Sequence, residues 1–232
     1  MNGAGRYAGG TSEGLNSGER PGTDWIPAEC DVSIRPGWFY HPSEDSKVKS
    51  PERLLEIYYE SVGRGACLNL NIPPDRRGQI NENDIRSLKA FRQHLDATFA
   101  KDLALGAKVS ASNTRGGSKQ FAAEHVLRSR PGAYWATDDE VTTPELVLEL
   151  GKPVTFNVVS LREYLPLGQR IEAVGLDQWK DGQWAEFAQA TSIGNHRLIR
   201  TEPVTTERVR LRITKAAVCP ALAEFGLFVE PR

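Results

Sequence analysis

Apolar and polar residues alternate in the second half of the chain. Residues 208–214, RVRLRIT, place apolar side chains on one face and arginines on the other, and residues 145–150, ELVLEL, repeat the pattern. A period of two residues is typical of half-buried β-strands. Residues 179–184, WKDGQW, carry an Asp-Gly pair that suits a two-residue hairpin turn. Residues 105–232 therefore predict an antiparallel β-sandwich.

The preceding part of the chain mixes helical and strand periods. The Ser-Pro pair at residues 50–51 predicts a helix start, followed by apolar positions at helical spacing that end at Gly63. Residues 66–72, ACLNLNI, suit a short buried strand. A second amphipathic helix follows, capped by Asn81 or Asn83.

With a strand before the first helix, these elements form two β/α units. Such units close a parallel sheet or barrel, and the chemistry of a barrel lies at the C-terminal ends of its strands. Those ends fall here around residues 29–38 and 71–75. About 75 residues cannot bury both faces of a parallel sheet, so we expect the rest of the barrel to precede Met1.

Composition narrows the class of protein. Apolar residues make up 39% and charged residues 25%, with a net charge of -1, which argues against disorder and against a nucleic-acid footprint. No apolar run is long enough to span a membrane, and residues 1–24 lack the pattern of a signal peptide. Cys30, Cys67 and Cys219 have no metal-ligand or disulfide spacing, so we expect buried free thiols.

The most informative stretch is residues 25–41, WIPAECDVSIRPGWFYH, which gathers acidic residues, an arginine, aromatics and a histidine just beyond a strand. Carboxylates and arginine bond sugar hydroxyls, and aromatic faces cover the apolar side of a sugar ring. This combination indicates a carbohydrate site.

The same stretch, followed by EDSKVKS and LLEIYYESVGRGACLNLNIPPDRRGQI, resembles glycoside hydrolase family 29, the α-L-fucosidases. It is most similar to the branch favouring α-1,3/1,4-fucosides, and the resemblance covers residues 25–100. It implies that residues 1–100 are the C-terminal part of a (β/α)8-like catalytic barrel. It also implies retaining hydrolysis of terminal α-L-fucosyl linkages in fucosylated glycans, by an Asp nucleophile and a separate acid/base.

The resemblance also assigns candidate site residues. Trp38 aligns with the aromatic residue that covers the C5-methyl group of fucose, and Glu29 matches a glutamate typical of this strand; Arg35 and Asn71 complete the substrate-binding candidates. Glu29 stays open between acid/base, substrate or outer ligand, and structural partner of Arg35. His41 is expected to anchor the loop. The family's nucleophile lies on an earlier strand and its acid/base also normally precedes this loop, so we expect this chain to lack both and to be inactive alone.

Residues 111–127, 133–139 and 221–228 resemble galactose-binding-like (discoidin, coagulation factor type C) domains. That resemblance implies a structural Ca²⁺ held by hard oxygen ligands, with Glu224 at the late position and Asp138 or Asp139 assisting; no other cofactor is implied. Family members are usually periplasmic or secreted. The alternative to an enzyme portion is a non-catalytic carbohydrate-binding sandwich with a residual barrel tail, or a purely structural sandwich.

Overall fold

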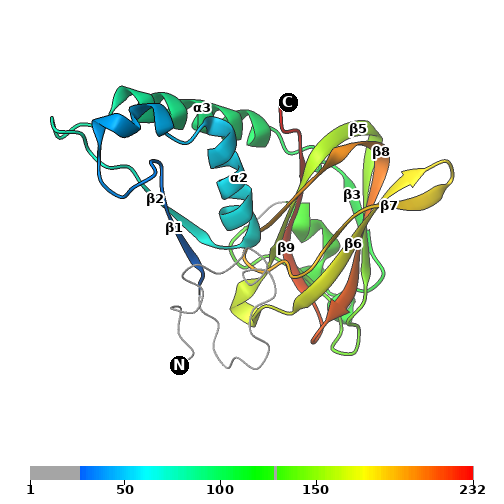
Figure 1. The fold of residues 1–232 in the computed structure, drawn as a ribbon. Helices are drawn as coiled ribbons and strands as arrows, with labels where there is room; N and C mark the ends of the chain where they lie inside the picture. Colours follow the sequence, from blue (N-terminus) through cyan, green and yellow to red (C-terminus); the bar gives the residue numbers. More distant parts are fainter. Residues whose placement is uncertain (1–26, 128–129, 232) are drawn as a thin grey trace.

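The computed structural model describes residues 27–127 and 130–231, and its first part is a small α/β layer (Figure 1). Strands β1 (Glu29–Ser33) and β2 (Cys67–Asn71) pair in parallel, and helix α2 (Pro51–Ser61) lies between them in sequence. Helix α3 (Glu82–Phe99) follows. The predicted order of strand, helix, strand, helix is confirmed, while Trp25 lies outside the described residues.

Helix α2 begins as predicted but ends differently. Ser50 caps it by accepting a hydrogen bond from the Arg53 amide at 3.3 Å. The helix ends at Ser61 and passes through a 3-10 turn to Gly65, whose φ of 85° is the left-handed cap conformation predicted for Gly63. A Cβ on Gly63 would lie 3.2 Å from the side chain of Leu198, so that glycine permits close packing instead.

Helix α3 is capped by Asn81, whose side chain accepts a hydrogen bond from the Asn83 amide at 3.0 Å. Its buried residues are polar: Asp84, Ser87 and Thr98. Its apolar positions are only partly buried. Strand β2 is also less buried than predicted, and Cys67 on it is exposed, which corrects the expectation of three buried thiols.

The second part is a seven-stranded antiparallel sheet in the order β4-β9-β5-β8-β6-β7, with β3 pairing β5. Its strands are β3 (Lys108–Ala111), β4 (Trp135–Ala136), β5 (Glu145–Glu163), β6 (Ile171–Lys180), β7 (Gln183–Ala190), β8 (Arg197–Ala216) and β9 (Ala221–Phe228). Short 3-10 helices complete the described elements: η2 (Pro42–Lys47), η3 (Val62–Arg64), η4 (Arg115–Gly117), η5 (Lys119–Phe121), η6 (Ala123–Leu127) and η7 (Leu165–Leu167).

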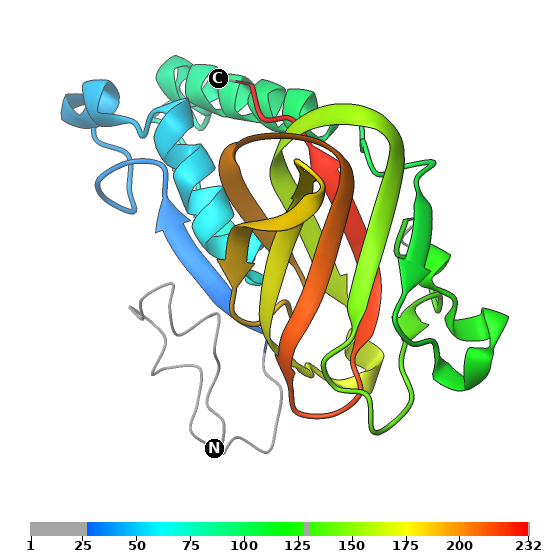
Figure 2. The same cartoon turned by 90° about the vertical axis from the view of Figure 1, so that its right-hand side faces the viewer.

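Strands β5 and β8 are long enough to serve both layers of the folded sheet, and Figure 2 shows them arching over the molecule. The first half of β5 pairs β3 and the end of β8; after an irregularity between Glu149 and Val154, the second half pairs β9 and the start of β8. The predicted hairpin turn is confirmed, because Asp181 and Gly182 have φ of 52° and 79°.

Apolar side chains between the layers form the main core. The alternation predicted from RVRLRIT is confirmed, since Val209, Leu211 and Ile213 are 0%, 0% and 2% exposed. Trp135 is fully buried, and its indole N–H donates to the Asn113 carbonyl at 3.0 Å.

A smaller buried cluster joins the two parts of the molecule. Tyr59 of α2 packs with Leu198 and Phe228 of the sandwich. The Arg200 guanidinium lies 3.6 Å from the centroid of the Tyr59 ring and forms an ion pair with Glu230 at 2.5 Å. The small α/β layer is therefore fixed on one face of the sandwich. Among the described residues no helix is both long and apolar enough to cross a membrane.

Candidate functional site

The C-terminal ends of β1 and β2 carry the most exposed aromatic side chains of the described structure. Residues 36–41 follow β1 as a loop, and in it Trp38 is 52% and Phe39 79% exposed. The ends of parallel strands are where α/β proteins place their ligands. This loop is therefore the candidate site.

Two side chains hold the first half of this loop. Ser33 donates its hydroxyl to the Gly37 carbonyl at 2.7 Å. The side-chain amide of Asn71 donates to the Trp38 carbonyl at 2.9 Å and to the Ser33 hydroxyl at 3.1 Å. Asn71, a candidate substrate ligand by sequence, thus fixes the backbone that carries Trp38.

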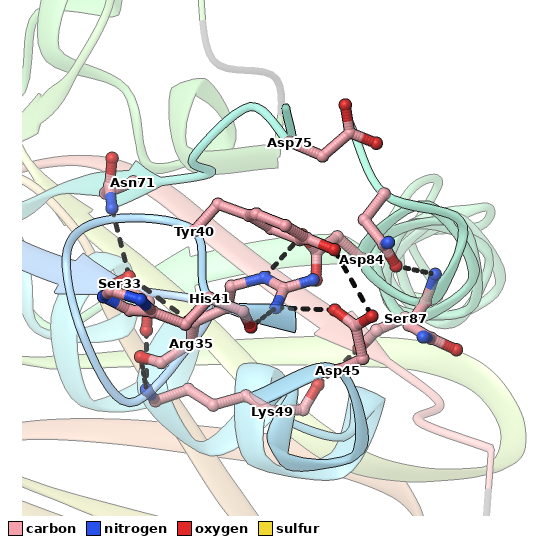
Figure 3. A network of polar contacts seen from close by, with 12 residues as sticks. Ser33, Arg35, Tyr40, His41, Asp45, Lys49, Asn71, Asp75, Asp84 and Ser87 are labelled. Carbon is pink, nitrogen blue, oxygen red and sulfur yellow. Dashed lines mark hydrogen bonds and ion pairs between the residues drawn. The ribbon is translucent and has the colours of Figure 1, made fainter. Parts of the chain in front are cut away.

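Arg35 lies beneath the loop in an ionic network (Figure 3). Its side chain is fully buried, with Nε 3.0 Å from Asp84 Oδ2 and Nη1 2.9 Å from Asp45 Oδ1. Its guanidinium carbon also lies 4.6 Å from the centroid of the Tyr40 ring. Burial alone would lower the pKa of Arg35, but hydrogen bonds to Asp84 and Asp45 outweigh it and raise that pKa above its ordinary value.

Further contacts tie the network to α3 and to the end of β1. The Lys49 ammonium donates to the carbonyls of Ser33 at 2.6 Å and Arg35 at 3.3 Å, and Ser87 of α3 donates to the Lys49 carbonyl at 2.5 Å. Burial, with nearby Arg53, lowers the pKa of Lys49. Asp45, Lys49 and Asp84 were not among the predicted site residues.

The backbone carbonyl of His41 accepts from Arg35 Nη1 at 3.4 Å, and it also accepts from the Glu44 amide at 2.9 Å. The backbone of His41 thus anchors the end of the loop.

Glu29 lies at the other end of β1. It is exposed and pairs in register with Cys67, whereas Ser33 pairs with Asn71. Four residues of strand separate it from Ser33, roughly 13 Å. The side-chain amide of Asn69 donates to the carboxylate of Asp31 at 2.6 Å and to that of Glu29 at 3.5 Å. The carboxylates bound to Arg35 are Asp84 and Asp45, so Glu29 does not serve as its partner.

Glu224, the calcium candidate, is engaged in a polar cluster of the sandwich. Its Oε1 accepts from Ser160 at 2.7 Å and its Oε2 lies 3.3 Å from Arg162 Nε. A guanidinium at that distance opposes a bound cation, so Glu224 does not fit a calcium ligand. Asp138 accepts from Asn113 and the Gly116 amide, at 2.9 and 2.8 Å. Over the described ranges no group of three acidic, histidine or cysteine side chains could hold a metal.

A separate cavity of about 450 Å³ opens among loops of the sandwich. Tyr134 lines it and stacks on Tyr164 with ring centroids 4.0 Å apart. Its remaining lining residues are Arg115, Ala136, Asp139, Leu167, Arg170, Val218 and Cys219.

Known proteins share this arrangement. The family model described as alpha-L-fucosidase matches residues 6–98, which include β1, α2 and β2 and nearly all of α3. "Alpha-L-fucosidase 1" of Arabidopsis thaliana is 41% identical over 217 residues, covering 92% of this chain and 42% of that protein. This chain is therefore similar to the α-L-fucosidases, over residues 6–98 by the family model and over 92% of its length by that relative.

Solved α-L-fucosidase structures match both parts of the chain. SpGH29 is 41% identical, with a TM-score of 0.87, over 95% of this chain and 48% of that one. A glycoside hydrolase family 29 fucosidase of Ruminococcus gnavus, solved in complex with fucose, is 31% identical with a TM-score of 0.86, over 93% and 43% of the two chains. The chain thus spans less than half the length of the relatives it matches.

Proposed function

We propose that the full-length protein is a retaining α-L-fucosidase acting on terminal α-1,3/1,4-linked fucose of glycans, and that this chain supplies one wall of its pocket. In this proposal, residues 1–100 are the C-terminal part of a (β/α)8-like barrel and residues 105–232 a galactose-binding-like sandwich. The nucleophile lies in the portion of the enzyme outside this chain.

Trp38 carries the proposal. It stands half exposed at the end of two parallel strands, and Asn71 and Ser33 fix the backbone on either side of it. A large aromatic side chain exposed on an anchored loop suits the apolar face of a sugar. Fucose presents such a face at its C5-methyl group. Asn71 acts in this proposal by holding Trp38, and its amide lies at the rim of the pocket.

Glu29 is not the acid/base in this proposal, because it lies at the start of β1, roughly 13 Å along the strand from Ser33 and the loop that carries Trp38; we place the acid/base, like the nucleophile, in the portion of the enzyme outside this chain. Its carboxylate is exposed and accepts from the side-chain amide of Asn69 at 3.5 Å, whereas neighbouring Asp31 accepts from it at 2.6 Å. A general acid must lie within hydrogen-bond reach of the leaving-group oxygen, and neither Glu29 nor Asp31 lies at the strand end that carries Trp38. Both lie on the face of the two strands that also carries Ser33 and Asn69.

The test is a chimera in which this chain replaces the corresponding 42% of the Arabidopsis protein. We expect the chimera to hydrolyse an aryl α-L-fucoside. The variant Glu29→Gln should keep kcat within about threefold of the unmodified chimera, on fucosides with poor leaving groups as on aryl fucosides. Asp31→Asn is the matched control.

A folded chimera without turnover would contradict the proposed function. A much larger loss for Glu29→Gln on poor than on good leaving groups would show that Glu29 is the acid/base and would contradict the placement of the site at Trp38.

The cavity beside Tyr134 favours a second function, carbohydrate binding by the sandwich. An aromatic wall with Arg115 and Asp139 at the rim offers both a stacking surface and hydroxyl partners. Calorimetry with fucose or galactose on the chain should give a saturable titration that Tyr134→Ala abolishes. A flat titration of the folded wild-type chain would reject this second function.

A further inference from the structure

The network around Arg35 connects helix α3 to the exposed aromatic loop through the interior of the molecule (Figure 3). Asp84 follows Trp38 by 46 positions in the sequence and, at 0% exposure, cannot touch a substrate. Arg35 is equally buried. Arg35 Nη2 and Asp84 Oδ1 are buried without a hydrogen-bond partner among the described residues, but separating the two charges would leave each of them unpaired away from water, so the pair fixes its two elements relative to each other.

Arg35 holds the second half of the loop. Its Nη1 donates to the His41 carbonyl at 3.4 Å, and its guanidinium carbon lies 4.6 Å from the Tyr40 ring centroid. Asn71 and Ser33 hold the first half, at Trp38 and Gly37. The exposed Trp38 and Phe39 therefore lie on a short segment that is anchored on both sides. Strand residues anchor its first half, and the buried Arg35 anchors its second half.

The charges of the network balance. Arg35 and Lys49 contribute two positive groups, and Asp45 and Asp84 two negative groups. Asp45 is one-third exposed, whereas Asp84 is fully buried. Water can therefore replace the charge of Asp45 in part, whereas water does not reach Asp84. Loss of the Asp84 charge should release Arg35 from its position under the loop.

We propose that Asp84, acting through Arg35, is a positioning residue that sets the order of the Trp38 loop and thereby the affinity of the site for its sugar. The effect on affinity rests on the proposed fucosidase function; the effect on loop order does not. Asp84 is not a catalytic residue in this scheme, since its carboxylate reaches Arg35 and no exposed surface.

The decisive variant is Asp84→Asn, measured in the chain by ¹⁵N relaxation of the amides of Trp38, Phe39 and Tyr40. We expect order parameters of about 0.85 in the wild type and below about 0.6 in the variant. Asp96→Asn is the matched control on the same helix, because it removes a carboxylate from an exposed pair with Arg92 at 2.7 Å. It should leave the loop unchanged.

Steady-state kinetics of the chimera with the Arabidopsis protein separate an effect on the order of the loop from an effect on the chemical step. Asp84→Asn should raise KM for an aryl α-L-fucoside about tenfold with kcat within about threefold, since the variant loosens binding and leaves the reacting groups in place. If the loop becomes mobile and KM does not change, the positioning scheme holds and the role of Trp38 in the site fails.

Unchanged order parameters in Asp84→Asn would overturn the proposal whatever the kinetics. Should that variant unfold, Arg35→Lys tests the same point, because a lysine cannot reach Asp84 and Asp45 with two separate donors in a fixed plane. A folded Arg35→Lys chain with a wild-type loop would overturn the proposal equally.

Discussion

The two parts of this molecule bury different kinds of side chain. In the sandwich, the largest fully buried residues are apolar, among them Trp135, Phe156 and Phe225. In the α/β layer, Arg35 and Asp84 are as deeply buried as any apolar residue there. The sandwich closes its own core between layers, whereas the two parallel strands leave one face carrying Glu29, Asp31 and Asn69 exposed.

This difference suits the two parts to different roles, stability for the sandwich and the geometry of the site for the α/β layer. A sheet folded on itself removes apolar surface from water without help from another segment. The α/β layer instead fixes its loop with charges and hydrogen bonds, which give defined geometry at modest net stability. Substitutions in the core of the sandwich should therefore change the free energy of unfolding, and substitutions on the exposed loop of the α/β layer should change chiefly the site.

The largest expected contrast is between two tryptophans. Trp135→Ala should cost about 3–5 kcal/mol of unfolding free energy, because it empties a fully buried site and leaves the Asn113 carbonyl without its donor. Trp38→Ala removes a side chain that is 52% exposed and should stay within about 0.5 kcal/mol of wild type. Denaturant unfolding measures both, and similar costs would break the comparison.

One of the buried polar side chains of the sandwich, that of His196, makes stability depend on pH. Burial, with nearby Arg162, lowers the pKa of His196 from 6.5 to about 3. Below pH 6.5 the unfolded chain protonates this histidine and the folded one does not, so stability falls as the pH falls. The loss should reach roughly 2.5 kcal/mol at about pH 4.5, at about 1.4 kcal/mol per pH unit.

His196→Gln isolates this effect. Ser160 and Arg162 contact the imidazole, and Glu224 is bound to both of them, while burial raises the pKa of Glu163 and shifts the pH dependence in the opposite direction. The difference in unfolding free energy between wild type and variant should shrink as the pH falls. A constant difference would show that His196 titrates normally.

A smaller effect is expected at the junction between the parts. Arg200→Ala removes the guanidinium stacked on Tyr59 and paired with Glu230, and should cost about 1–2 kcal/mol. Arg92→Ala, which breaks an exposed pair with Asp96, should cost less than about 0.5 kcal/mol. Hydrogen exchange should show that the Arg200 variant loosens α2 first; faster exchange in the sandwich core alone would contradict a junction role.

Local patterns predicted much of this fold. Strand alternation in residues 208–214, the Asp181-Gly182 turn and the Ser50 cap depend on neighbours in sequence, and each is confirmed. The end of α2 was misplaced, because Gly63 and Gly65 look equally suitable and only packing against Leu198 distinguishes them. That β5 and β8 each serve both layers depends on long-range pairing, which no local period encodes.

The site was predicted in outline only. The cluster of aromatic and charged residues in 25–41 pointed to the loop that carries Trp38. The partners of Arg35 were missed. In the sequence, Asp84 looks like any acidic residue in the first turn of a helix, and Asp45 looks like a surface residue. Glu29, four residues before Ser33, turned out to lie at the far end of its strand.

The central claim is that Trp38 lines the fucose pocket, and sugar discrimination tests it most directly. In the chimera, kcat/KM should be compared for an aryl α-L-fucoside and the matching α-L-galactoside, which carries a hydroxymethyl group in place of the C5-methyl. We predict that Trp38→Ala lowers kcat/KM for the fucoside and reduces its preference over the galactoside by about tenfold or more, with Trp184→Ala as the unaffected control. An unchanged preference in Trp38→Ala would contradict the account.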